Sequence, residues 1–157
     1  MYLRTFFIVL AAVMALTTAG YYLGTKVLFD KSIPDAPCSM EIANGAFIND
    51  EYQKYQFNGA ITLWLKNNMI TVFGVYDTAD GMKKLTRSIL LDHIKRKSKV
   101  VTADVKSTAI APSDEVQGLE SFFASKGEPL TFHFQRIKSG EYLVTINNNW
   151  VALCKEH

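Results

Sequence analysis

The side chains that carry most protein chemistry are few in this chain, and they lie far apart in its sequence. The histidines are His93, His133 and His157, and no acidic cluster accompanies any of them. The sequence has no nucleophile elbow, no His-Glu-x-x-His zinc motif, no phosphate-binding loop and no dinucleotide-binding glycine motif. We therefore expect no enzymatic activity, no catalytic residues, no metal site and no cofactor.

His133 alternates with Phe132 and Phe134, so we expect its imidazole to face solvent while the two rings face a core. A pH-sensing role for His133 or for His93 is an alternative, because histidine titrates near neutral pH.

Two cysteines, Cys38 and Cys154, stand near the two ends of the region that follows the N-terminal segment. They show no Cys-x-x-Cys spacing of the kind that binds zinc. In an oxidising compartment they would form a disulfide around a loop of about 116 residues, which the chain-entropy relation values at about 4–5 kcal/mol. We expect this disulfide, and hence a domain outside the cytoplasm. The alternative is a pair of buried free thiols in a cytosolic domain.

The N-terminal segment has the composition of a membrane anchor. No charged residue occurs between Thr5 and Thr25, and Arg4 and Lys26 flank this run. About 20 apolar residues suffice to cross a bilayer as a helix. We predict a single-pass anchor over residues 1–29, a linker over 30–37 and a domain over 38–157. A cleaved signal peptide is the alternative, although its apolar region is typically only about 7–15 residues long.

Small residues recur within this predicted anchor at helical spacing. Small side chains let helix backbones approach closely in lipid, as in the Gly-x-x-x-Gly motif. We expect a face for a partner helix, although such residues are also common in anchors without partners. The candidate residues are Ala11, Ala15, Ala19, Gly20 and Gly24.

The formal charge argues against nucleic-acid binding. Arg4 and Lys26 are the only charged residues before Asp30, and they account for the net charge of +2. The rest of the chain is formally neutral, whereas a nucleic-acid surface requires a basic excess or stripe. The chain is not expected to bind nucleic acid.

Alternating apolar residues predict a mainly β, α+β domain. We expect hairpins formed by residues 61–65 with 70–74, 82–96 with 99–110, and 130–134 with 142–146, and a last strand near 150–154. One helix is expected after Pro112, capped by Asp114 and packing through Val116, Leu119 and Phe123. The predicted fold is an antiparallel β-sheet or half-barrel with one helix, preceded by the transmembrane helix.

The chain resembles the FidL-like family of enterobacterial inner-membrane proteins. The resemblance rests on the short anchor, on Cys38 soon after it, on the strand that begins Phe57-Asn-Gly59, and on the closing segment Asn147–Cys154. Proteins of this kind are similar in architecture to the accessory proteins ToxS and PsaF. Those proteins pair outside the cytoplasm with ToxR-like, membrane-bound winged-helix transcription regulators.

The resemblance implies an accessory protein of the bacterial inner membrane, with its N-terminus cytoplasmic and its domain periplasmic. Its expected partners are the lipid bilayer and the periplasmic domain of a winged-helix regulator, which it would bind and stabilise. The alternative is a stand-alone anchored binder of a small amphipathic ligand, lipocalin-like, with aromatic side chains lining a cavity.

Overall fold

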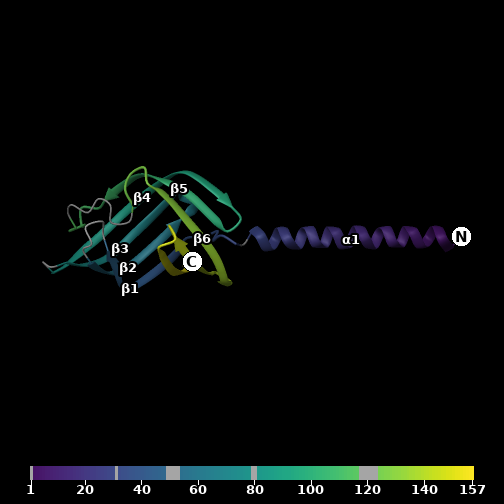
Figure 1. Ribbon diagram of the computed structural model, residues 1–157, viewed down its shortest axis with the longest axis horizontal. Coiled ribbons are helices and arrows are strands. Elements are labelled where there is room, and N and C mark those ends of the chain that lie inside the picture. The colour runs from purple at the N-terminus through teal and green to yellow at the C-terminus, as the bar shows by residue number, and fades with distance from the viewer. Residues whose placement is uncertain (1, 31, 49–53, 79–80, 117–123) are drawn as a thin grey trace. The chain divides into compact units, whose positions relative to one another are not determined.

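The chain forms two units, Met1–Ser32 and Ile33–His157, which are described separately. The computed structural model describes residues 2–30, 32–48, 54–78, 81–116 and 124–157. The first unit is the helix α1 (Tyr2–Asp30), and the second is built from strands (Figure 1). No helix in the described part of the chain is both long and apolar enough to cross a membrane.

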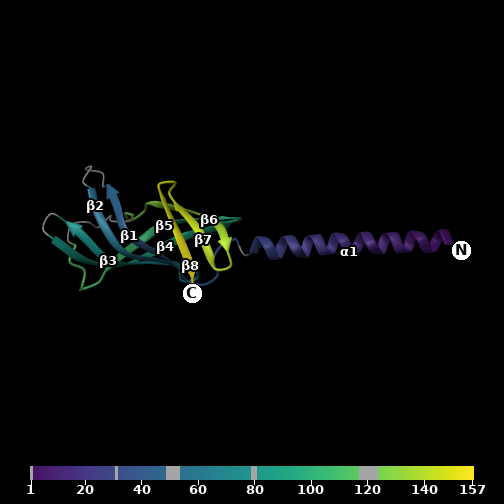
Figure 2. The same cartoon turned by 90° about the horizontal axis from the view of Figure 1, so that it is seen from below.

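The second unit is a closed antiparallel barrel in which each strand pairs with the next along the chain and β8 pairs back to β1. The strands curve around a common interior, as the two orthogonal views show (Figures 1 and 2). They are β1 (Cys38–Ile48), β2 (Lys54–Trp64), β3 (Met69–Thr78), β4 (Gly81–Lys97), β5 (Val100–Ile110), β6 (Pro129–Lys138), β7 (Glu141–Ile146) and β8 (Trp150–Glu156).

Closure of the sheet corrects the predicted half-barrel. The three predicted hairpins are present as β2–β3, β4–β5 and β6–β7, and the last predicted strand is β8. The prediction missed β1, because Cys38–Ile48 contains Asn44 and Gly45, which interrupt its apolar alternation. β1 is the strand that β8 needs for closure, and without it the remaining strands leave an open sheet.

Most of the helix predicted after Pro112 falls outside the residues that the structure describes. Residues 112–116 form a turn followed by irregular chain. The Asp114 carboxylate contacts Arg87, and it also accepts the Val116 N–H at 2.9 Å, a bond of the kind that caps a helix. Residues 117–123, which include Gln117, Leu119 and Phe123, lie outside the described residues.

The inward side chains of the strands form the hydrophobic core of the barrel. Inward positions alternate along each strand, and on β5 they are Val101, Ala103 and Val105. Gly59 and Gly74 face each other across β2 and β3, and the Phe57 ring covers both. A Cβ atom at Gly74 would lie 2.6 Å from this ring, so the close packing requires glycine there.

Each end of the barrel carries a distinct set of connections. At one end, which we call the entry end, β1 begins and β8 ends. The β2–β3, β4–β5 and β6–β7 turns lie at the same end. The β2–β3 turn includes the short helix η1 (Leu65–Asn67) and the left-handed Asn68. The opposite end carries the β7–β8 turn, the start of β4 and the segment after β5.

Candidate functional site

The seam between β1 and β8 has the shortest ladder of the barrel among the described residues. Its ladder pairs only Cys38–Met40 with Cys154–Glu156. By comparison, the β2–β3 ladder runs from Gln56–Asp77 to Trp64–Met69. Beyond Met40 and Cys154, residues 41–48 and 151–153 have an edge without a strand partner in the described part of the chain.

A bulge in β1 ends the seam ladder. The register of β1 against β2 shifts between Ile42 and Gly45. Asn44 adopts a positive φ of 54°, and its backbone N–H donates to the Asn58 side-chain oxygen at 2.6 Å. Bulges bend a strand and terminate pairing. The bulge follows the last ladder pair, Met40 with Cys154, so the part of β1 that would continue the ladder is irregular.

The predicted disulfide is present and lies across this seam. Cys38 and Cys154 are bonded, with their Cα atoms 5.5 Å apart, and both are fully buried. Cys38 pairs with Glu156 in the ladder and Cys154 pairs with Met40, so the bond runs diagonally between the two strands. The disulfide covalently fixes the entry end of a seam that has few backbone hydrogen bonds.

The outer surface of β8 beside the seam is apolar. Val151 is 63% exposed and Leu153 is 41% exposed. Leu143 on β7 pairs with Leu153 and is partly exposed. The inward neighbours Trp150 and Ala152 are partly buried and pack against the core. An exposed apolar stripe next to an open strand edge is a surface suited to pairing with another chain.

Several aromatic residues face the barrel interior, where a lipocalin-like ligand would bind, and that alternative stays a prediction. Each of them has at most 3% of its surface exposed: Phe57, Tyr76, Phe132, Phe134 and Tyr142. Phe134 lies between Phe132 and Tyr142, with ring centroids 6.5 and 6.3 Å apart. These three rings therefore contact one another and stabilise the barrel.

A buried ion pair lies at the opposite end of the barrel. Arg87 occupies an inward position of β4, and its Nε donates to Asp114 Oδ2 at 3.0 Å, with side-chain exposures of 3% and 0%. The same guanidinium donates through Nη2 to the Val116 carbonyl at 2.8 Å. Sequence reasoning missed this pair. The available signal was a charged residue at an inward position between Leu85 and Ile89.

The pair fastens residues 111–116 along β4. The Ala111 N–H donates to the Thr86 carbonyl, and the Glu115 N–H donates to the Lys84 carbonyl. Burial raises the pKa of Asp114, but hydrogen bonds from Arg87 and from the Thr86 and Val116 N–H groups lower it by more. The net pKa of Asp114 lies below its ordinary value, so this carboxylate stays charged at neutral pH.

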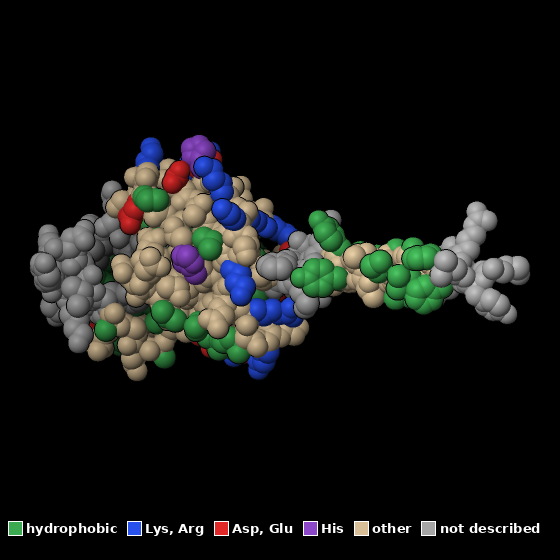
Figure 3. Space-filling model, turned by 45° about the vertical axis from the view of Figure 1, so that its right-hand side comes forward, with side chains coloured by type: hydrophobic (Ala, Val, Ile, Leu, Met, Phe, Trp, Pro, Cys, Tyr) green, Lys and Arg blue, Asp and Glu red, His purple; other side chains and the backbone are tan. Residues whose placement is uncertain are grey.

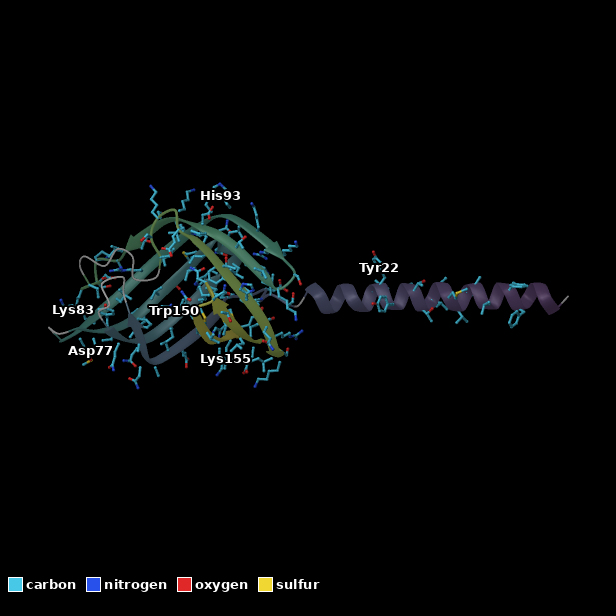
Figure 4. All side chains as sticks on the ribbon, in the orientation of Figure 1. Tyr22, Asp77, Lys83, His93, Trp150 and Lys155 are labelled. Atoms are coloured by element: carbon cyan, nitrogen blue, oxygen red, sulfur yellow. A yellow bond between two sulfur atoms is a disulfide. The ribbon has the colours of Figure 1, made fainter. Side chains whose placement is uncertain are left out.

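The structure does not gather the histidines into a site. His93 projects from the outside of the barrel wall (Figure 4), where its Nδ1 lies 3.1 Å from Asp104 Oδ2. The His133 side chain is exposed, as predicted. Among the described residues, no group of three or more histidine, cysteine or acidic side chains is placed to hold a metal ion.

The predicted helix-partner residues lie in α1. Ala11, Ala15, Ala19, Gly20 and Gly24 are exposed along it. Nothing lies within 4 Å of a Cβ atom built on Gly20 or Gly24. Their role in binding another helix stays a prediction.

Comparison with known proteins gives no relative from which a function can be transferred. No protein-family model, no curated protein and no solved structure matches the chain. The fold is therefore defined by its own geometry, as a disulfide-closed, eight-stranded antiparallel barrel.

Proposed function

We propose that this chain is an accessory protein of the bacterial inner membrane that binds and stabilises the periplasmic domain of a ToxR-like, membrane-bound transcription regulator. The observation that carries the proposal is the seam between β1 and β8. Its ladder spans only three residue pairs, and beyond them lie open strand edges beside the exposed Val151 and Leu153. The resemblance to the FidL-like family points to the same class of partner.

In this proposal α1 is the anchor, with the N-terminus in the cytoplasm and the barrel in the periplasm. The charge-free run from Thr5 to Thr25 supports membrane insertion. The disulfide supports the oxidising side of that membrane. The small residues of α1, including Gly20 and Gly24, supply a second surface for the partner's own transmembrane helix.

The proposed contact is strand addition. A strand of the regulator's periplasmic domain pairs with the open edge of β8 at residues 151–153 and covers the apolar outer surface of Val151 and Leu153. Main-chain hydrogen bonds then supply affinity, while the apolar side chains favour a partner strand with matching residues. A signal alters the regulator by shifting the population between its free and paired forms.

Site-specific photocrosslinking tests this contact in the intact protein in its native membrane. A photoreactive residue at Val151 should give a covalent adduct with a second membrane protein. The matched control is Thr102, an exposed residue on β5, which should give no such adduct. Equal adduct yields from Val151 and Thr102, or none from Val151, would exclude the seam as the interface.

A further inference from the structure

Charge is unevenly distributed over the barrel, although the chain after α1 carries almost no net charge. The basic side chains gather at the entry end, on the β2–β3, β4–β5 and β6–β7 turns and on the end of β8. Figure 3 shows this gathering of Lys and Arg on one part of the barrel. We call these residues the basic rim: Lys66, Lys95, Arg96, Lys97, Lys99, Arg136, Lys138 and Lys155.

The side chains of the basic rim are all exposed, and most of them have no counter-charge. Lys138 lies 3.1 Å from Glu141, and Arg96 donates to the Leu65 carbonyl at 3.0 Å. Within the described residues, no ion pair involves the remaining lysines of the rim. These ammonium groups are therefore available to an external anion.

Acidic side chains of the entry end mostly accept hydrogen bonds from the barrel itself. Glu156 Oε1 accepts the backbone N–H groups of Asp35 and Ala36, each at 2.7 Å. Asp92 Oδ1 accepts the His93 N–H at 2.9 Å, and Glu141 pairs with Lys138. These carboxylates keep their charge, so they offset part of the rim's positive potential. The eight basic side chains of the rim still outnumber the acidic residues of this end, which are Asp35, Asp92, Asp104, Glu141 and Glu156.

The chain from α1 also enters the barrel at this end. Ile33 packs against the core, and the Pro37 carbonyl accepts the His157 N–H at 3.0 Å. A barrel tethered to a membrane through α1 is therefore attached at the end that carries the basic rim. Ile137 stands in the same rim between Arg136 and Lys138 and is 57% exposed. An apolar side chain between basic ones matches the headgroup boundary of a bilayer.

We infer that the basic rim binds the anionic phospholipid headgroups of the membrane in which α1 is anchored. This inference rests on the anchoring part of the proposed function and adds a lipid contact to it. Each lysine held at an anionic surface contributes attraction that decays within a Debye length. The contact orients the barrel so that the seam, which opens towards the opposite end, stays accessible to the regulator.

Amine-reactive footprinting of the full-length protein in nanodiscs tests the lipid contact. One set of discs contains phosphatidylcholine alone, and the other contains phosphatidylcholine with phosphatidylglycerol. The labelling rates of Lys66, Lys97 and Lys99 should fall about five-fold in the anionic discs at low salt, and molar salt should abolish the difference. Lys106 and Lys126, exposed lysines outside the rim, should label equally in both discs.

A charge-reversed variant supplies the second arm of this test. The triple variant Lys66→Glu, Lys97→Glu, Lys99→Glu should lose the lipid-dependent protection of Lys95 and Lys155. The matched variant Lys106→Glu, Lys126→Glu should retain it. These positions are exposed, so both proteins are expected to fold, and their thermal unfolding is compared first.

The outcomes separate the lipid contact from the proposals on which it rests. If the chain does not incorporate into discs, both the proposal that α1 is a membrane anchor and this inference are wrong. A chain that incorporates but labels equally in both lipids overturns the lipid contact alone and leaves the regulator contact standing. Protection of the rim lysines by a co-purified protein, without any effect of lipid, overturns the inference and assigns the rim to a protein partner.

Discussion

The Arg87 guanidinium and the Asp114 carboxylate meet at 3.0 Å in the wall of the barrel, where water reaches neither side chain appreciably. Arg87 comes from β4, and Asp114 comes from the segment that follows β5. Their contact holds residues 111–116 along β4, beside backbone hydrogen bonds to Thr86 and Lys84. Among the described residues, this ion pair is therefore the main polar interaction that holds the segment after β5 at the end of the barrel opposite the entry end.

Removing one member of this pair should destabilise the barrel strongly. Asp114→Asn leaves the buried guanidinium without its counter-charge, and loss of one partner from a buried pair costs about 3–5 kcal/mol. Chemical denaturation of the full-length protein in detergent measures the free energy of unfolding. The double variant Arg87→Met, Asp114→Leu should recover part of the loss, because it leaves no unpaired charge. Equal destabilisation by the double and single variants would contradict this account.

The same carboxylate should make stability depend on acidity. The pKa of Asp114 in the folded protein lies below its ordinary value of 3.8. Its contribution is therefore complete above the unfolded pKa and is lost as the pH falls through the lower folded pKa. Unfolding measured from pH 6 downwards should show a steeper acid loss in the natural protein than in Asp114→Asn. Identical slopes would mean that Asp114 does not titrate below its ordinary range.

Loss of the disulfide should open the seam before the rest of the barrel. The ladder between β1 and β8 has three residue pairs, and Cys38–Cys154 joins the same two strands. Cys38→Ser with Cys154→Ser should lower the free energy of unfolding by about 2–5 kcal/mol. Hydrogen exchange should accelerate at residues 38–40 and 154–156, with β3 and its partner β4 affected least. Uniform acceleration throughout the barrel would argue against a local weakness at the seam.

Overpacking beneath Phe57 should also be costly. A methyl group at Gly74 would meet the backbone carbonyl oxygen of Asn58, and would lie 2.6 Å from the Phe57 ring and 2.8 Å from the Gly59 Cα atom. Gly74→Ala should therefore destabilise the barrel by about 1–3 kcal/mol in thermal or chemical unfolding. Gly24→Ala is the control, because nothing lies within 4 Å of the added methyl there. A neutral Gly74→Ala would contradict this account, because both Phe57 and the β2 backbone at Asn58 and Gly59 would have to shift.

Local patterns in the sequence predicted the hairpins because their cause is local. Alternation around the turns at Asn68 and Gly140 specifies both the inward face and the register. The disulfide was also predictable, since Cys38 and Cys154 have no other cysteine to pair with. These features need no knowledge of residues distant in the sequence.

Barrel closure and the buried ion pair depend on distant residues, and local patterns do not encode them. β1 carries a bulge at Asn44, which breaks the alternation that would have marked it as a strand. The sequence places Arg87 at an inward position of β4, but it does not show that the partner is Asp114, 27 residues further along the chain. The open seam depends on how β1 and β8 pair, so the sequence of either strand alone does not predict it.

Affinity purification of the intact protein from native membranes under non-reducing conditions tests the central claim most directly. Mass spectrometry then identifies the proteins that accompany it. The account predicts recovery of a single-pass protein with a cytoplasmic winged-helix domain, and loss of that protein from a Val151→Lys, Leu153→Lys variant that folds normally. Recovery of the disulfide-bonded chain alone would contradict the accessory role.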